Sequence, residues 1–386
     1  MMMDSERLAP QRPFRDRSFG LMRKLLRVNW LFVLCVCLLA GVGYTALYSA
    51  AGGAPRPYAD SQLFRFIGAL VLMLGIAMVD IRQIAKISWP AYALGVLLLL
   101  VVMKFGHTGL GAKRWMTVGG MEIQPSELMK LFLTLGLAAY FRRATQERLN
   151  EALFLLPAVA AILLPVGLIL KEPNLGTAVI TAMIGATVML GAGVRWWKFA
   201  ILLGVMLVAA PLLYHHLHDY QRARITTFLN PGSDPLGAGY NIIQSKIALG
   251  SGGLTGQGYL HGTQNQLNFL PEKQTDFVFT IIAEEFGFLG SMAVLVLLFS
   301  IIAMALYTAI SCGHVYGRLV ALGVAANFFL YCFVNLSMVM GLIPVGGVPL
   351  PLISYGGSAL TAVMLGFGVL MSVHVHRDVE FASEEF

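Results

Sequence analysis

The long apolar runs of this chain constrain its fold more than any other feature. They are continuous rather than alternating, and most approach the roughly 20 residues that a helix needs to cross a bilayer. Inside a bilayer every backbone N–H and C=O must be paired within the protein, so spanning segments are helices or closed barrels, and the lack of alternation excludes a barrel. The composition agrees, because 57% of the 386 residues are hydrophobic and only 12% are charged.

The sequence therefore predicts an all-α integral membrane protein with ten transmembrane helices. The polar segment 215–275 is expected to form a large extracytoplasmic loop between helices seven and eight. The eighth span exceeds the bilayer thickness, so we expect it to tilt or project. This membrane domain, residues 28–377, lies between a basic tail, 1–27, and a short tail, 378–386. The predicted spans are 30–50, 63–79, 88–105, 125–141, 152–170, 175–193, 196–214, 276–310, 317–341 and 358–375.

The distribution of Lys and Arg predicts the orientation. Sixteen basic residues fall on one side of the predicted spans, and the positive-inside bias makes that side cytoplasmic together with both termini. The net charge of +7 is then an orientation signal and a contact with membrane lipids rather than a nucleic-acid site. No cleavable signal peptide is expected. The sixteen residues are Arg7, Arg12, Arg15, Arg17, Arg23, Lys24, Arg27, Arg82, Lys86, Arg142, Arg143, Arg148, Arg195, Lys198, Arg318 and Arg377.

Asp276 stands where the polar segment ends and the eighth apolar run begins. An acid at this boundary has access to water and lies beside lipid, which an enzyme acting on a lipid-linked substrate requires. The local sequence favours a helix cap, because Asp is a good N-cap and an acid in the first turn suits the helix dipole. Farther into the same run, Glu284 and Glu285 predict a polar interior, with at least one acid facing a partner or a wet cavity.

A second group of charges begins the fourth span. Glu127 and Lys130 are three residues apart and so share a helix face. They form either a neutralising ion pair or a substrate site in which Lys130 contacts an anion and Glu127 orients it. Just before them, Lys113, Arg114 and Trp115 occupy an outward loop. Positive charge there opposes the orientation bias, so we expect an anionic ligand with Trp115 as an interfacial anchor, or an ordinary headgroup contact.

Several loop segments admit two interpretations. The glycine-rich run 250–258 is either a flexible linker or a set of backbone amides that approaches sugar or phosphate closely. Residues 241–249 predict a short interfacial helix, and the uncharged segment 341–358 predicts a packed or re-entrant loop. A divalent cation such as Mg²⁺ or Mn²⁺ is possible, but no metal site is evident. Interfacial histidines are favoured over a metal site for the cluster His215, His216, His218 and Asp219.

Four motifs together resemble the SEDS family (shape, elongation, division and sporulation). The ending Gly-Phe-Gly-Val-Leu-Met-Ser-Val-His-Val-His-Arg at 366–377 resembles the RodA branch more than the FtsW branch. The match runs from about residue 28 to 377, in order and at the expected spacing. The motifs are Gln-Pro-Ser-Glu-Leu-Met-Lys at 124–130, Glu-Pro-Asn-Leu-Gly-Thr at 172–177, Gln-Thr-Asp-Phe-Val-Phe at 274–279 with Ala-Glu-Glu-Phe-Gly at 283–287, and Pro-Leu-Ile-Ser-Tyr-Gly-Gly-Ser at 351–358.

The resemblance implies a peptidoglycan glycosyltransferase that polymerises lipid II at the outer face of the bacterial cytoplasmic membrane for cell elongation. The essential aspartate of the family falls on Asp276, which would be the general base of an inverting reaction. The conserved Glu and Lys of the fourth span fall on Glu127 and Lys130. One departure concerns Asn174, where the family usually has Asp, so a titrating role there is doubtful. Ser354 and Tyr355 belong to the last motif and are further candidate substrate contacts.

The resemblance also implies a class B penicillin-binding protein, a transpeptidase, as partner within the elongation machinery. Lys130, with Lys113 and Arg114, would stabilise the departing diphosphate. Three alternatives stay open at this point: a flippase for lipid-linked precursors, a division-type paralogue similar to FtsW, and a scaffold for a partner enzyme. The charged motifs gather at the predicted outer surface and no internal repeat is evident, which favours surface chemistry over transport.

Overall fold

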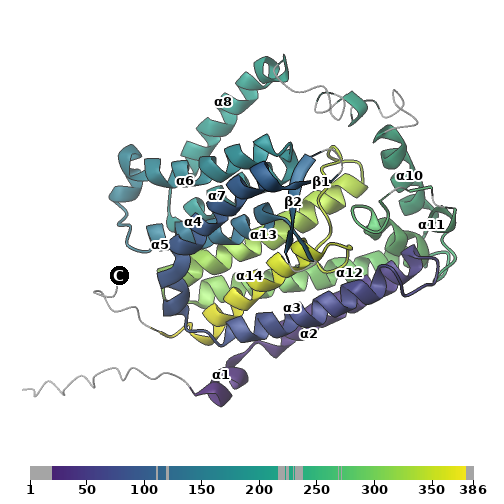
Figure 1. Ribbon diagram of the computed structural model, residues 1–386, viewed down its shortest axis with the longest axis horizontal. Helices are drawn as coiled ribbons and strands as arrows, with labels where there is room; N and C mark the ends of the chain where they lie inside the picture. The colour runs from purple at the N-terminus through teal and green to yellow at the C-terminus, as the bar shows by residue number, and fades with distance from the viewer. Residues whose placement is uncertain are drawn as a thin grey trace, which may run out of the picture.

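The computed structural model is mostly helical (Figure 1). It describes residues 20–109, 112–118, 121–215, 222, 226–228, 230, 238–267, 269–270 and 272–379. Within these residues, eight helices are long and apolar enough to cross a membrane: α2 (Trp30–Ala50), α3 (Ala59–Ala77), α4 (Ile81–Phe105), α6 (Ala152–Lys171), α7 (Leu175–Ala192), α12 (Val278–Ser311), α13 (Val315–Val339) and α14 (Gly357–Val375).

The other two predicted spans also coincide with helices. They are α5 (Pro125–Phe141), which has 17 residues, and α8 (Trp196–His215). A multi-pass helical membrane protein is thus confirmed, while the count of ten spans stays a prediction. The remaining helical elements are short: α1 (Leu21–Arg27), η1 (Arg148–Asn150), α10 (Ala238–Ser251) and α11 (Thr263–Gln266).

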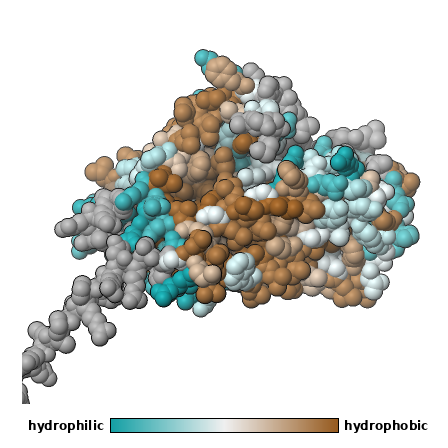
Figure 2. All heavy atoms as spheres, turned by 60° about the horizontal axis from the view of Figure 1, so that its bottom comes forward, coloured by the Kyte–Doolittle hydropathy of each residue, from teal (hydrophilic) through white to brown (hydrophobic). Residues whose placement is uncertain are grey.

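A broad apolar surface covers the middle of the molecule, with hydrophilic regions toward both ends (Figure 2). The apolar side chains that it exposes include Phe64 on α3, Leu153 on α6 and Phe299 on α12. Such an extensive exposed apolar surface is far larger than soluble monomers carry and matches a surface solvated by lipid.

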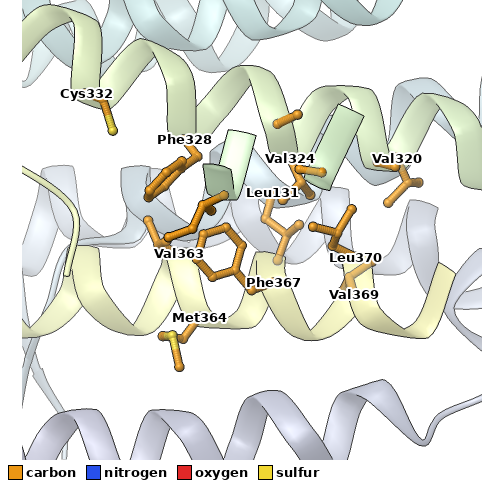
Figure 3. Packing of buried hydrophobic residues seen from close by; sticks show 14 of the residues in the cluster. Leu131, Val320, Val324, Phe328, Cys332, Val363, Met364, Phe367, Val369 and Leu370 are labelled. Carbon is orange, nitrogen blue, oxygen red and sulfur yellow. The ribbon is translucent and has the colours of Figure 1, made fainter. Parts of the chain in front are cut away.

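Helices α13 and α14 lie at the centre and are the most buried of the candidate spans. Val324 and Phe328 of α13 point toward Val363 and Phe367 of α14 (Figure 3). Leu131 of α5 joins the same cluster. Helices in lipid gain little from the hydrophobic effect, so close packing of this kind holds them together.

On its other side α14 packs along α3. Gly368 permits this close approach, because a Cβ atom placed there would lie 2.9 Å from the Met73 carbonyl oxygen and 3.1 Å from the Met73 Cα. Both contacts are with backbone, so a larger residue would force the two helices apart.

A small antiparallel sheet follows α4, and the all-α prediction is wrong for this segment. Its strands are β1 (His107–Gly109), β2 (Ala112–Val118) and β3 (Met121–Ile123), in the order β1-β2-β3. The strands are separated by two residues each, and the second pair is Gly119-Gly120, a dipeptide that favours hairpin turns. The segment predicted as a loop is therefore ordered, and it carries Arg114 and Trp115 on a strand.

Helix α12 has 34 residues, more than a bilayer requires, and it is broken at Gly287 into two helical parts. Gly287 has φ 65° and ψ −158° inside the helix, a conformation that is essentially restricted to glycine. The glycine-rich segment lies against this break. The amides of Gln257 and Gly258 donate to the carbonyls of Glu284 and Glu285, at 2.9 and 3.1 Å.

On the other side of the break, the amides of Phe288 and Leu289 donate to the carbonyls of Gly253 and Leu254, at 2.9 and 3.1 Å. Both interpretations of the run 250–258, a flexible linker and a site for sugar or phosphate, are therefore wrong for the residues that bond to α12. The run is docked rather than a flexible linker, and these amides and carbonyls are engaged with α12 rather than offered to sugar or phosphate.

Glu284 and Glu285 are both buried at 1% exposure, as the prediction of a polar interior required. Glu284 accepts hydrogen bonds from the Thr263 hydroxyl and the Gln264 amide, at 3.2 and 2.9 Å. Glu285 accepts from the hydroxyl of Ser49 and the amide of Asn265. Both acids fasten α11 and its flanking loop to the transmembrane helices.

The predicted interfacial helix is present as α10, and it packs on α12 and α13. Ile242, Ser245 and Ala248 form its buried face, and the Ser245 hydroxyl donates to the Val339 carbonyl. The segment 341–358 is packed as predicted, with Val348, Leu350 and Ile353 all buried.

Basic residues gather at the end of the molecule where α3, α12 and α14 finish. Lys24 donates to the Met78 carbonyl at 2.7 Å, Arg27 bonds to Asp378, and the Gly313 amide donates to the Arg377 carbonyl at 3.1 Å. Because α14 ends here after 19 residues, its first residue lies roughly 28 Å away along the helix axis. That distance is close to the thickness of a bilayer core.

Gly287→Ala tests the broken helix. A Cβ atom at this position would lie 2.3 Å from the Gly256 nitrogen, and alanine is strained at this φ and ψ, so we expect a loss of about 1–3 kcal/mol or more. The midpoint of thermal unfolding in detergent should fall clearly. Gly68→Ala is the matched control, because nothing lies within 4 Å of a Cβ atom there. Equal midpoints for both variants would contradict the role given to Gly287.

Candidate functional site

A cavity of about 290 Å³ lies at the end of the molecule opposite the basic cluster. Residues from all four sequence motifs reach it, although they lie far apart in the chain. Its walls come from β2, the beginnings of α5, α7 and α14, the turn before α12, α13, and the loop between α13 and α14. Among the predicted site residues, Arg114, Trp115, Glu127, Asn174, Asp276 and Tyr355 line it.

Asp276 lies in the turn that precedes α12, and it is half-buried on the cavity wall. The helix begins at Val278 with Phe277 as its N-cap residue, and no side chain caps it. The local prediction that Asp276 serves as a helix cap is therefore wrong. Gly347 lies beside this residue, because a Cβ atom built there would be 3.8 Å from Asp276 Oδ2. The carboxylate is therefore next to the backbone of the loop between α13 and α14, and both residues line the cavity.

Glu127 and Lys130 form the predicted ion pair, with Lys130 Nζ 2.8 Å from Glu127 Oε1. The Tyr331 hydroxyl of α13 bonds to both side chains, donating to Glu127 Oε2 and accepting from Lys130 Nζ. Lys130 also lies over the Tyr331 ring, 4.1 Å from its centroid, and is only 1% exposed. Glu127 and Tyr331 line the cavity whereas Lys130 does not, so direct contact between Lys130 and a substrate anion would require rearrangement.

Arg114 brings positive charge to the cavity. Its Nε donates to the Glu172 carbonyl at 2.9 Å, and Nη2 donates to the Pro173 carbonyl. Both acceptors are neutral carbonyl groups in the turn between α6 and α7, so these bonds fix the guanidinium without cancelling its charge. Trp115 joins it on the cavity wall, and the side chain of Lys113 lies outside the described residues.

Glu172 is an unusual neighbour for this arginine. It is 2% exposed, and neither carboxyl oxygen has a hydrogen-bond partner among the described residues. Burial raises its pKa to about 8, although the nearby Arg114 lowers it. At neutral pH the carboxyl group is therefore mostly protonated and does not neutralise Arg114. Arg114 thus offers the cavity a positively charged group that suits an anionic ligand.

Asn174 occupies the position at which the resemblance implies Asp. It is the N-cap residue of α7, and its side-chain oxygen accepts from the Thr177 amide at 3.4 Å. A neutral amide can perform this capping role, so the departure from the family pattern does not disturb the local fold. The same residue lines the cavity.

The last motif divides into a structural residue and a cavity residue. The Ser354 hydroxyl accepts from the Leu350 amide at 2.8 Å and is buried away from the cavity. Tyr355 lines the cavity, with its ring 5.3 Å from that of Tyr58 and 5.1 Å from the Arg65 guanidinium carbon. Ser354 therefore shapes the loop, and Tyr355 faces the cavity.

Sequence reasoning missed Tyr331, Glu272 and the loop 345–349 as parts of the cavity. A tyrosine in a mostly apolar span was the available signal for Tyr331, since polar groups inside a membrane usually face a partner. No signal could have placed the loop, because its apolar residues and glycines carry no side-chain chemistry. Of the possible metal cluster, His216, His218 and Asp219 lie outside the described residues, and the described part of the chain holds no group of three or more metal-ligating side chains.

A second cavity of about 640 Å³ lies between α7, α12 and α13. Its lining is almost wholly apolar and includes Leu298, Phe299, Phe329 and Phe333. Within the part of the chain that the structure describes, no charged side chain lines this cavity.

Comparisons with known proteins agree with the motifs. Residues 26–379 match the family of FtsW, RodA and SpoVE, described as cell cycle protein. The chain is 41% identical to the peptidoglycan glycosyltransferase MrdB of Escherichia coli K12, over 89% of this chain and 93% of MrdB. It is 33% identical to the stage V sporulation protein E of Bacillus subtilis 168, over 89% of this chain and 96% of that protein.

Solved structures share the fold. A chain in a peptidoglycan synthase complex, studied for how it coordinates polymerization and crosslinking, aligns with a TM-score of 0.78 and 31% identity, over 91% of this chain and 98% of that one. The rod shape determining protein RodA of Thermus thermophilus aligns with a TM-score of 0.67 and 28% identity, over 92% of this chain and 98% of that one.

The raised pKa of Glu172 predicts a pH dependence of stability. Between its ordinary value of 4.5 and about 8, the folded state holds a proton that the unfolded state releases, so stability falls as pH rises through this window, by up to about 1.4 kcal/mol per unit. In Glu172→Gln this contribution should disappear. Thermal midpoints at pH 5 to 9 measure the difference, with exposed Glu147→Gln as control. Parallel curves for wild type and Glu172→Gln would contradict the assignment.

Proposed function

This chain belongs to the FtsW/RodA/SpoVE family, and we infer from its relatives and its cavity that it is a peptidoglycan glycosyltransferase of the RodA type. One observation carries the inference: the four motifs shared with the family converge on one cavity that holds Asp276 and Arg114. Identity favours the elongation branch over the division branch, at 41% for MrdB against 32–35% for three FtsW proteins.

The substrate in this proposal is lipid II, a disaccharide-pentapeptide on undecaprenyl diphosphate. The donor sugar has an α-linked diphosphate and the polymer is β-1,4-linked, so the reaction inverts the anomeric carbon. The acceptor 4-hydroxyl oxygen attacks this carbon, and its proton passes to the Asp276 carboxylate. The bond to the diphosphate oxygen breaks, and its electron pair leaves with the undecaprenyl diphosphate.

Arg114 is the cavity residue suited to stabilise that departing diphosphate. It lines the cavity on a rigid strand, with its guanidinium held by two carbonyl groups. A fixed positive group stabilises charge that develops in the transition state without reorganising. Lys130 instead holds Glu127 in place, because Glu127 and Tyr331 bind its ammonium group within the protein.

A divalent cation would add further charge for the diphosphate when bound. Glu272 is the carboxylate that would hold it, since it lines the cavity, both oxygens of Glu127 are bonded to Lys130 and Tyr331, and Asp276 accepts the proton. Carboxylate oxygens are the ligands that Mg²⁺ and Mn²⁺ prefer.

The proposed topology has ten spans, with both termini in the cytoplasm and the loop 215–275 outside. The cavity then faces the extracytoplasmic side, about one bilayer thickness from the basic cluster. The similarity to a chain of a peptidoglycan synthase complex supports a class B penicillin-binding protein as partner. A flippase would make no new glycosidic bond, so polymer formed by the purified protein separates the two functions.

Asp276→Asn tests the general base. The amide cannot accept the proton, so the rate of glycan polymerisation from labelled lipid II should fall about 10²–10⁴-fold, with little change in thermal midpoint. Glu122→Gln is the matched control, because Glu122 is exposed on the neighbouring sheet and does not line the cavity. Polymer made by Asp276→Asn at near the wild-type rate would reject the assignment.

Arg114→Ala tests the diphosphate site. At saturating lipid II the rate should fall about 10²–10³-fold, because a preorganised charge on the leaving group is lost. Arg56→Ala is the control, since the Arg56 side chain is 88% exposed and lies away from the cavity. An unchanged rate for Arg114→Ala would show that another group stabilises the leaving diphosphate.

A further inference from the structure

Asp276 lies in the turn before α12 and not in the helix itself. Its position therefore depends on contacts with other elements. The turn before α12 ends at Phe277, and the Asp276 amide donates to the Glu272 carbonyl at 3.2 Å within the same turn. A turn of this kind leaves the direction of a side chain open unless another element fastens its backbone. A base displaced by about 1 Å can lose roughly 10²-fold in rate.

The fastening group is the side-chain amide of Asn335 on α13. Its Nδ2 donates to the Asp276 carbonyl at 2.8 Å and to the Val348 carbonyl at 2.8 Å. The residue is fully buried, at 0% exposure. Both hydrogens of one NH₂ group are thus used to join α13 to the loop that follows it and to the turn before α12, which is 59 residues away in sequence. Without this donor two carbonyl oxygens would lose a partner inside the protein.

The two carbonyl groups belong to two segments that line the cavity, the turn before α12 and the loop between α13 and α14. Val348 follows Gly347, the residue beside the Asp276 carboxylate, so Asn335 sets the gap between the acid and the loop. A second bond ties the same loop to the same turn, because the Tyr355 amide donates to the Gln274 carbonyl at 2.8 Å.

One face of α13 contacts two of the acids that line the cavity, Glu127 and Asp276. Tyr331 precedes Asn335 by four residues and so lies on the same face of α13. Tyr331 bonds to Glu127 and Lys130, and Asn335 bonds to the backbone of Asp276. The separation between Glu127 and Asp276 is therefore set through α13, which is bonded both to α5 and to the turn before α12.

We propose that Asn335 is a positioning residue that holds Asp276 and the loop at Val348 in the geometry needed for glycosyl transfer. This proposal rests on the proposed function, in which Asp276 is the base. Asn335 touches no reacting atom, and its effect on the rate passes entirely through Asp276. Losing Asn335 should therefore matter only while residue 276 can act as a base.

The test is a double-mutant cycle on the full-length protein, measuring polymerisation of labelled lipid II. Asn335→Ala should lower kcat about 10–100-fold and leave KM within about twofold, because the base is displaced and substrate binding is kept. Combined with Asp276→Asn, it should cause little further loss, since a residue that acts through Asp276 has nothing left to position. Asn327→Ala, two turns earlier on α13 and away from the cavity, is the matched control and should keep the wild-type kcat.

Two results overturn the proposal. The first is a kcat of Asn335→Ala within twofold of wild type. The second is a kcat of the double variant that is lowered by the product of the two single-variant factors. Asn335→Leu, which keeps the volume and lacks the donor, repeats the measurement if Asn335→Ala does not fold. If neither variant folds, the proposal fails as well, because Asn335 is then a requirement of the fold. Full activity of Asp276→Asn alone would reject the proposed base itself, whereas an inactive Asp276→Asn with an active Asn335→Ala rejects only the positioning role.

Discussion

The break of α12 at Gly287 is the constraint on which the cavity depends. A helix that crosses a bilayer must pair every backbone group, and a break leaves carbonyl and amide groups open at a depth where each unpaired group is costly. The segment 252–258 supplies the missing partners on both sides of the break. The part of α12 before Gly287 can therefore take a different direction from the part after it. Asp276, which directly precedes α12, lies at the cavity as a result. The glycines 252 and 256 allow the contact, because a Cβ atom on either would meet the α12 backbone.

Charged side chains inside the protein are held in two different ways. Lys130, Glu127 and Tyr331 satisfy one another and form a closed group with little free charge, which makes them tolerable within a membrane. Arg114 is held differently, because two of its hydrogen bonds go to carbonyl groups, and the adjacent Glu172 carboxyl keeps its proton at neutral pH. Arg114 thus brings a positively charged group to one wall of the cavity. That arrangement is suited to a substrate whose leaving group is an anion.

Much of the candidate site was predictable from the motifs, but the roles of individual residues were less so. Glu127, Asn174, Asp276 and Tyr355 line the cavity as their motifs implied, and Arg114 lines it as the charge of its segment predicted. Lys130 and Ser354 belong to the same motifs but do not line the cavity. Lys130 forms an ion pair with Glu127, and Ser354 accepts a hydrogen bond from the Leu350 amide within its loop. A motif lists residues that occur together and does not say which of them face the ligand. Tyr331 and Asn335, which organise both acids, are outside every motif used.

By itself, the sequence determined the membrane class, the positions of the helices and the family, because apolar runs of bilayer length and ordered motifs are local properties of the chain. It also implied a catalytic role for Asp276 against the local preference for a helix cap. Only the tertiary structure decided that Arg114 lies on a strand, that α12 is broken and docked by a distant glycine-rich segment, and that α13 fastens the turn bearing Asp276. These features depend on hydrogen bonds between residues far apart in the chain, and the pattern of a single segment holds no information about such partners.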